Sequence, residues 1–234
     1  MNPKSPLWPT LEALDRLWAS PAGAAVEEGK AAGFSTLARP GLPGRPKTLI
    51  IGAVSPVVRG AVSELGPHCV FQAYPPPLGM RPGDDAALMM DTDLPPFARG
   101  SFDLVLLSHV LEYRSTPLAL LSLVYEILQP QGRVLVFTPH VLQPSGLQVG
   151  HGRRFWDWQI GGLMRQSAFT VQGRAAIRAS AWRPATLIHS GAPQVPPRPT
   201  GLRPPFNLWE ALQRLRRPQG IAASCKTGFR RCHE

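Results

Sequence analysis

Apolar residues form two short, nearly continuous runs in the middle of the chain, at residues 102–107 and 133–138. Such runs are typical of strands that are buried on both faces of a parallel sheet. Between them, apolar positions recur at helical spacing after Thr116 and Pro117, a pair that suits a helix start. The Gln-Pro-Gln-Gly segment at 129–132 indicates where this helix ends. The pattern therefore predicts a βαβ unit, whose crossover is right-handed in nearly all cases.

Further helices and strands are expected on both sides of this unit. Before it, the pattern predicts two helices, then a strand, a helix and two more strands, at residues 9–20, 21–33, 48–51, 57–65, 69–73 and 87–90. After it, we expect a helix and a strand that starts at Phe169, then a proline-rich connector, an amphipathic helix and a closing strand at residues 193–205, 206–217 and 220–229. The N-terminal helices are expected either to pack on the sheet or to cover a site.

At 234 residues, the chain is expected to form one domain of moderate size. We divide it into an N-terminal helical segment at 1–38, an α/β core at 39–190, and a final segment at 191–234. The final segment is rich in Pro and Arg, and it is expected to add the connector, a helix and the closing strand to the same domain.

Charge is unevenly distributed along the chain. Residues 1–150 carry 11 basic and 12 acidic side chains, whereas residues 151–234 carry 14 basic and 3 acidic ones, a net charge of +11 in that segment. A basic C-terminal third indicates an acidic partner, of which nucleic acid is the commonest. The alternative is that Arg is simply the usual surface residue of this protein, since 21 of its 25 basic residues are Arg.

Cysteine content and hydropathy limit the class of protein. The three cysteines, Cys69, Cys225 and Cys232, have no paired spacing, which argues against a disulfide framework and against a zinc site. No apolar stretch is long enough to cross a bilayer, and the N-terminal residues lack the continuous apolar core of a secretory signal. We therefore expect a cytoplasmic protein that binds neither a metal nor a membrane.

A resemblance to a known family begins at residues 101–138. These residues read SFDLVLLSHVLEY, a helix and LQPQGRVLVFTP, and they resemble the fourth and fifth strands of class I S-adenosylmethionine-dependent methyltransferases. The residues that match are Phe102, Asp103, His109, Leu111, Glu112, Leu128, Pro130 and Gly132, whereas Gln131 departs from the usual glycine. The resemblance implies a Rossmann-like three-layer α/β sandwich, with a mostly parallel sheet and an antiparallel last strand.

Within that family, the chain resembles uncharacterised bacterial proteins of the methyltransferase type 11 group. The shared features are an early Ala-Ser-Pro-x-Gly, a degenerate glycine turn that ends in Pro, and a Gly-His-Gly-Arg sequence, here at residues 19–23, 52–56 and 150–153. This closer resemblance identifies no substrate.

The resemblance also implies S-adenosylmethionine as the cofactor, together with the positions that would hold it. In this sequence these positions are Gly52, Ala53, Ser55, Tyr74, Asp91 and His109. A tight turn after the first strand lets a ligand approach the backbone, and the helix N-terminus at Ser55 offers N–H groups to a carboxylate.

Two positions depart from the family pattern. Ile50 stands where the first strand usually carries an acid, and Ala73 and Tyr74 stand where an Asp or Glu usually binds the ribose hydroxyls. Tyr74 offers only one hydrogen bond or a stacking face. The cofactor motifs are therefore degenerate, and this weighs more against activity than a missing catalytic residue would.

Candidate catalytic and substrate-binding residues follow the fourth and fifth strands. His109 is a candidate general base because an imidazole titrates near neutral pH, although a structural role is the commoner one for a lone His at a strand end. The candidates for substrate binding are Glu112, His151, Arg153 and Arg154. Adjacent arginines bind phosphate or carboxylate well, and a solvated loop is the alternative for this segment.

The sequence thus predicts a methyltransferase that uses S-adenosylmethionine and whose acceptor, a small molecule or a macromolecule, is unknown. Such an enzyme acts chiefly by holding donor and acceptor together, so it requires no particular side chain. The alternative is a non-catalytic protein of the same fold that uses its basic C-terminal third to hold RNA or an acidic protein.

Overall fold

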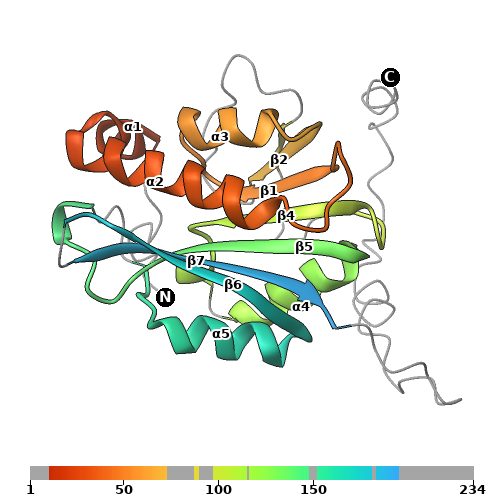
Figure 1. Ribbon diagram of the computed structural model, residues 1–234. Coiled ribbons are helices and arrows are strands. Elements are labelled where there is room, and N and C mark those ends of the chain that lie inside the picture. The colour runs from red at the N-terminus through yellow and green to blue at the C-terminus, as the bar shows by residue number, and fades with distance from the viewer. Residues whose placement is uncertain are drawn as a thin grey trace, which may run out of the picture. The chain divides into compact units, whose positions relative to one another are not determined.

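The computed structural model describes residues 11–72, 87–89, 97–114, 116–147, 152–180 and 183–194. At its centre lies a seven-stranded sheet with the strand order β3-β2-β1-β4-β5-β7-β6 (Figure 1). The strands are β1 Thr48–Gly52, β2 His68–Gln72, β3 Ala87–Met89, β4 Phe102–Ser108, β5 Leu128–Pro139, β6 Phe169–Arg178 and β7 Pro184–Pro193. Strands β1 to β5 are parallel, and β7 runs antiparallel to both β5 and β6. This order confirms the predicted α/β fold.

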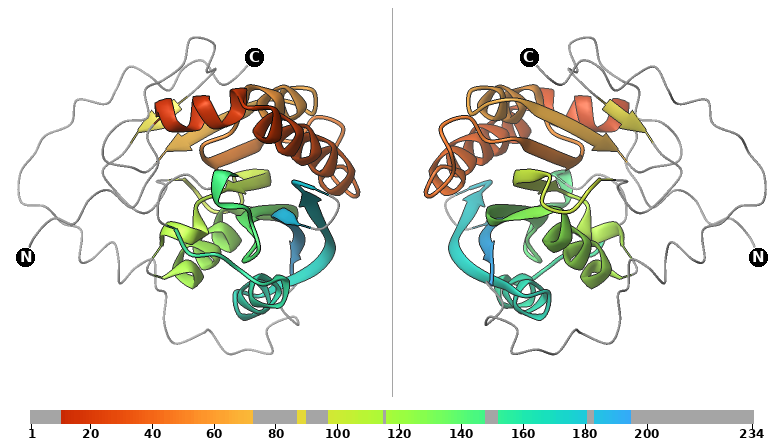
Figure 2. Two further views of the ribbon diagram at one scale, coloured as in Figure 1. Left: turned by 90° about the vertical axis from the view of Figure 1, so that its left-hand side faces the viewer. Right: turned by 90° about the vertical axis from the view of Figure 1, so that its right-hand side faces the viewer.

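Helices cover both faces of the sheet. They are α1 Leu11–Ala19, α2 Pro21–Ala38, α3 Pro56–Ser63, α4 Pro117–Ile127 and α5 Asp157–Gln166, and two short 3-10 helices lie at Leu111–Tyr113 and Ser145–Leu147. The two side views show α1, α2 and α3 on one side of the sheet and α4 and α5 on the other (Figure 2). The described elements therefore form the three layers of a Rossmann-like sandwich.

The apolar runs of the sequence form the core between the sheet and the layer of α2 and α3. Ile50, Leu104, Leu106 and Leu135 are fully buried and belong to one cluster with Phe34 of α2. All five residues of β1 are buried, as expected of a central strand in a parallel sheet. Burial on both faces explains why these strands read as continuous apolar runs.

Helix α2 is longer than the sequence indicated, because it continues past residue 33 to Ala38. Gly29 and Gly33 are weak helix formers, yet both face the sheet. A Cβ at either position would lie 2.6 Å from a side-chain carbon of Ile177 or Ile188. The two glycines therefore allow the helix to lie close to β6 and β7.

The helix start predicted at Thr116 and Pro117 is found, but without the expected cap. Pro117 opens α4, whereas the Thr116 hydroxyl makes no capping hydrogen bond. The fixed φ of the proline suits the first helical turn on its own.

Strand β7, residues 184–193, runs antiparallel to both of its neighbours, whereas the closing strand expected at residues 220–229 lies outside the described part of the chain and stays a prediction. Strands β6 and β7 form a hairpin whose register runs from Phe169 opposite Pro193 to Arg178 opposite Pro184. The two prolines stand at the ends of β7, where few ladder hydrogen bonds are lost. The core boundary expected at residue 190 therefore falls inside a strand.

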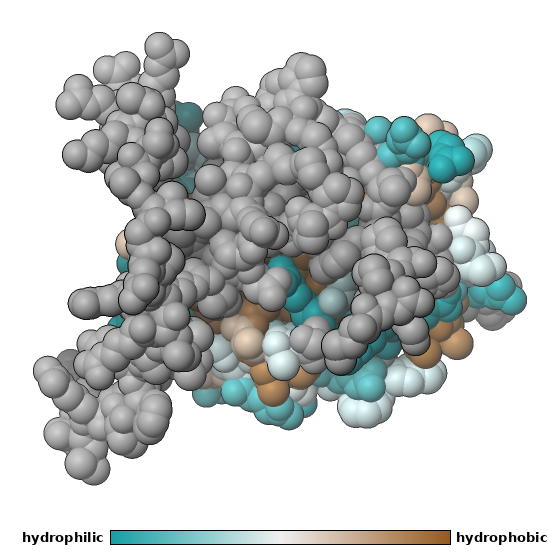
Figure 3. Space-filling model, turned by 180° about the vertical axis from the view of Figure 1, so that it is seen from behind, coloured by the Kyte–Doolittle hydropathy of each residue, from teal (hydrophilic) through white to brown (hydrophobic). Residues whose placement is uncertain are grey.

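Three further observations concern only the described residues. None of their helices is both long and apolar enough to cross a membrane. They contain no group of three or more His, Cys, Asp and Glu side chains that could hold a metal ion. Where they are visible from behind, hydrophobic and hydrophilic residues are interspersed on the surface (Figure 3).

The end of β1 lies very close to the end of β4. Gly52 has a φ of +102°, in the region that favours glycine, and a Cβ there would lie 2.2 Å from the carbonyl oxygen of Ser108. The Ser108 hydroxyl donates a hydrogen bond of 2.6 Å to the carbonyl of Ala53, the next residue of the turn. The turn after β1 therefore has room only for glycine at its first position.

We expect Gly52→Ala to lower the free energy of unfolding by about 2–4 kcal/mol, because it adds both backbone strain and a steric clash. The measurement is urea denaturation of both proteins. Gly60→Ala is the matched control: it lies in α3, and a Cβ there would meet nothing within 4 Å. That control should be neutral or stabilising by up to about 1 kcal/mol. Equal stability of the two variants would contradict this account.

Candidate functional site

The carboxyl ends of β1 and β4 form the point where the strand order of the sheet reverses. From β1 the chain continues to β2 and β3 on one side, and from β4 it continues to β5 on the other. In open α/β sheets, ligands bind in the crevice outside such a switch point. The structure brings to this edge five residues that the sequence singled out, namely Gly52, Ala53, Ser55, His109 and Glu112.

Ser55 connects the turn after β1 to a buried carboxylate on α2. Its oxygen caps α3 by accepting a hydrogen bond from the Val58 N–H at 3.3 Å, and its hydroxyl donates to Oε2 of Glu27 at 2.7 Å. Nζ of Lys30 donates to Oε1 of Glu27 at 2.5 Å. Glu27 is 4% exposed and Lys30 is 6% exposed. Helix α2 therefore places a buried ion pair against the start of α3.

His109 and Glu112 form a pair at the end of β4. Nδ1 of His109 lies 3.0 Å from Oε1 of Glu112, at hydrogen-bond distance. Glu112 is buried, whereas His109 is partly exposed and has a φ of +52°, which residues other than glycine rarely adopt. Among the described residues, Nε2 of His109 and Oε2 of Glu112 have no hydrogen-bond partner. Two polar atoms at this edge are thus available to a ligand.

Burial shifts the two pKa values of this pair in opposite directions. It raises the pKa of Glu112 to about 8, while the backbone N–H of Glu112 and the charge of Lys30 act to lower it. Burial lowers the pKa of His109 well below the usual 6.5, and Lys30 lowers it further. At neutral pH the pair is therefore mostly uncharged, a protonated carboxyl beside a neutral imidazole. We call Glu27, Lys30, Ser55, His109 and Glu112 the polar cluster.

The loop before α5 packs against this cluster. The backbone N–H of Arg153 donates to the carbonyl oxygen of Glu112 at 2.9 Å. A Cβ at Gly152 would lie 2.8 Å from Cγ of Glu112, so only glycine allows the loop to come this close. The segment that the sequence indicated as a substrate-binding loop therefore lies beside the end of β4.

The predicted residues of this loop differ in their surroundings. Nη1 of Arg154 donates to the carbonyl oxygens of Val141 and Gln143, at 3.3 and 2.9 Å, and so holds the loop after β5. The side chain of Arg153 is exposed. Three predicted site residues lie outside the described part of the chain and stay predictions: Tyr74, Asp91 and His151.

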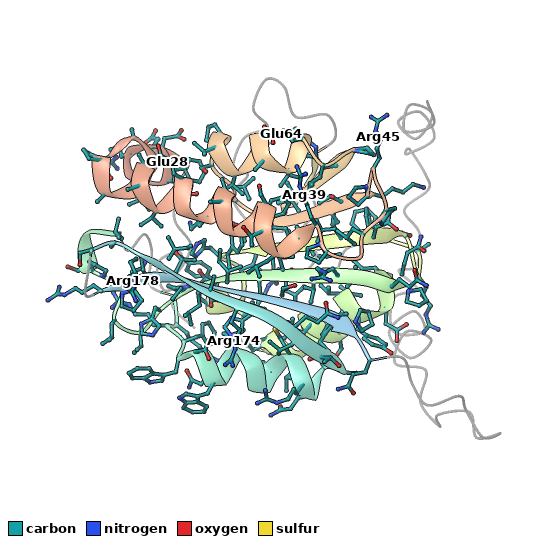
Figure 4. All side chains as sticks on the ribbon, in the orientation of Figure 1. Glu28, Arg39, Arg45, Glu64, Arg174 and Arg178 are labelled. Carbon is teal, nitrogen blue, oxygen red and sulfur yellow. The ribbon has the colours of Figure 1, made fainter. Side chains whose placement is uncertain are left out.

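Glu27 and Lys30 were missed by the sequence analysis, although the chain carries a signal for them. The buried residues of α2 form one stripe along the helix: Gly23, Val26, Glu27, Lys30, Phe34 and Ala38. Charged residues on an otherwise apolar stripe indicate buried partners. Glu28, by contrast, lies on the exposed side of α2 (Figure 4).

Comparison with known proteins shows similarity to methyltransferases. A family model described as a methyltransferase domain matches residues 82–136, which include β4 and α4. No curated protein sequence matches the chain. The chain therefore has the fold of S-adenosylmethionine-dependent methyltransferases, as the resemblance in the sequence predicted.

Three solved structures show how similar the fold is. A methyltransferase from Aquifex aeolicus is 12% identical, with a TM-score of 0.55 over 77% of this chain and 97% of that chain. One from Mesorhizobium loti is 17% identical, with a TM-score of 0.53 over 73% and 99%. The 1,6-didemethyltoxoflavin-N1-methyltransferase of Burkholderia thailandensis, solved with S-adenosylhomocysteine, is 15% identical, with a TM-score of 0.53 over 73% and 78%. At such identities the likeness concerns the fold alone.

We expect Glu112→Gln to change how stability depends on pH. The folded protein keeps a proton on Glu112 up to a pKa of about 8, whereas the unfolded chain releases it near 4.5. Wild-type stability should therefore fall as pH rises from about 5 to about 8, and the variant, which has no proton to lose there, should lack this contribution. Urea denaturation across this range should show that, as pH rises, the unfolding free energy of the variant increases relative to that of wild type.

Glu64→Gln is the control for this experiment, because Glu64 is exposed at the end of α3 (Figure 4). The stability of Glu64→Gln relative to wild type should vary little with pH. A difference between Glu112→Gln and wild type that stays constant from pH 5 to pH 9 would show that the carboxyl does not hold its proton in the folded state.

Proposed function

We propose that the protein is a methyltransferase that uses S-adenosylmethionine and whose methyl acceptor is unidentified. The observation that carries the proposal is the polar cluster at the switch point between β1 and β4, in a sheet with the strand order of this fold. A buried cluster of polar side chains at that edge is where a ligand is expected in an open α/β sheet. The Burkholderia relative, which holds S-adenosylhomocysteine, supports the same cofactor here.

The residues at this edge are compatible with such a cofactor. Gly52 keeps the turn free of a side chain, and the positive end of the α3 dipole lies beside it. Oε2 of Glu112 is buried and has no hydrogen-bond partner among the described residues. A polar ligand would satisfy such an atom, which otherwise costs free energy. Tyr74 and Asp91 remain the predicted contacts for the adenosine end.

When bound, the cofactor would supply an electrophilic methyl group on a sulfonium. The chain has mainly to position the acceptor, because correct placement accounts for much of the rate in such a transfer. Nε2 of His109 is the candidate contact for the reacting atom of an acceptor, while Glu112 holds Nδ1 on the other side of the ring. Because burial lowers the pKa of His109, it is a weak base at neutral pH. The exposed side chain of Arg153 is a candidate contact for an acceptor that carries a negative charge.

The alternative is a non-catalytic binding protein, and it rests on a different part of the chain from the methyltransferase proposal. Its basis is the basic C-terminal third, most of which lies outside the described residues, so RNA or an acidic protein stays a predicted partner. Nothing in the polar cluster itself favours that function.

Calorimetric titration of the full chain tests the proposal. We expect S-adenosylmethionine and S-adenosylhomocysteine to bind with dissociation constants between about 1 μM and 1 mM. ATP and NAD, the ligands of other Rossmann-like enzymes, should not bind. Absence of heat with both S-adenosyl ligands at millimolar concentration, or binding of ATP or NAD in their place, would refute the proposed function.

A further inference from the structure

Helix α2 carries two opposite charges into the edge where β1 ends. Glu27 and Lys30 are both more than nine-tenths buried, and they pair with each other and with Ser55 at the start of α3. Removing two charges from water is expensive, and a buried pair is often no more stabilising than apolar residues of the same size. The pair therefore calls for an explanation other than stability.

Docking of the helix does not provide that explanation, because apolar contacts already hold α2 in place. Phe34 and Ala38 are fully buried in the core cluster. Gly29 and Gly33 lie against the side chains of Ile177 and Ile188. The charged pair occupies the same stripe one turn earlier, where an apolar residue would continue the packing.

The charged groups retain capacity for further hydrogen bonds. An ammonium has three donors, and Nζ of Lys30 uses one of them on Glu27. A carboxylate has about four acceptor sites, and Glu27 uses two of them, for Lys30 and Ser55. Glu112, whose Oε2 has no hydrogen-bond partner among the described residues, is close enough for the charge of Lys30 to affect its pKa. Three side chains at one edge thus have polar atoms to offer a ligand.

The combination of charges fits one kind of ligand group. An α-amino acid carries an ammonium and a carboxylate on the same carbon atom, and Glu27 and Lys30 present the complementary charges side by side. The positive end of the α3 dipole adds further attraction for a carboxylate. A simple anion or a simple cation would meet one matching and one repelling charge.

Strand β1 itself brings no charged side chain to this edge. Its residues are TLIIG, and Ile50 is fully buried in the core cluster. Glu27 brings a carboxylate to the same turn from a different element, 28 positions before the Ser55 that it contacts.

We propose that Glu27 and Lys30 form the subsite for the amino-acid end of S-adenosylmethionine, with Glu27 binding its ammonium group and Lys30 its carboxylate. This inference rests on the proposed function. Helix α2 is then part of the cofactor site, which goes beyond packing on the sheet.

The test compares ligands with and without the amino-acid end, by calorimetry on the full chain. S-adenosylhomocysteine should bind at least about tenfold more tightly than methylthioadenosine, because methylthioadenosine lacks the amino-acid end and so cannot form the charge-assisted hydrogen bonds to Glu27 and Lys30. Glu27→Gln and Lys30→Met should each weaken S-adenosylhomocysteine about tenfold or more and leave methylthioadenosine unchanged. Glu28→Gln, on the exposed side of the same helix, should change neither affinity.

Each outcome separates this inference from the proposed function. If wild type binds neither ligand, the proposed function fails. If wild type binds both ligands equally, or if Glu27→Gln weakens both equally, the cofactor binds but the subsite is wrong. If the variants fail to fold, the test uses wild type alone, with S-adenosylhomocysteine and its deaminated and decarboxylated analogues as ligands. Equal affinity of wild type for these three ligands would overturn the proposed subsite.

Discussion

The close approach of β1 to β4 is the constraint on which the candidate site depends. Because the carbonyl of Ser108 would lie 2.2 Å from any Cβ at position 52, the turn after β1 must begin with glycine. The hydrogen bond from Ser108 to Ala53 then fixes the turn, and Ser55 is placed to cap α3 and to meet Glu27. Of the glycines usual at this turn, the chain keeps the one whose replacement the backbone of β4 forbids. The contact with the Ser108 carbonyl thus explains why the degenerate turn keeps Gly52.

The fold was predictable from the sequence where burial alone determines which residues are apolar. Strands β1, β4 and β5 are central and buried, so their apolar runs stand out. Strand β6 lies at the edge of the sheet, and its residues alternate between exposed and partly buried, with arginines among the exposed ones. Its partner β7 begins and ends with proline, and the proline-rich connector was expected to begin at its last residue, Pro193. The hairpin was therefore the part least visible in the sequence.

The candidate site was predictable where the chemistry follows directly after a strand. Gly52, Ser55, His109 and Glu112 could be found because their positions relative to β1 and β4 are set by a few residues of local sequence. Glu27 and Lys30 carry a weaker signal, two charges on an otherwise apolar helix stripe, because their burial depends on how closely α2 lies on β6 and β7. That distance is set by Gly29 and Gly33, which read locally only as weak helix formers.

Three features that oppose stability lie at one edge of the sheet. A buried ion pair, a buried carboxyl with a raised pKa and a histidine at positive φ all lie at the carboxyl ends of β1 and β4. The core cluster around Ile50 and Leu104 is apolar, although β7 also buries Thr186, His189 and Ser190. Replacing such polar groups with apolar ones is often neutral or stabilising, so folding alone gives no reason for a charged pair beside β1. A polar ligand that completes their hydrogen bonds does give a reason. For this chain, the argument for cofactor binding therefore rests on the polar cluster between β1 and β4 and on the helix that contributes two of its charges.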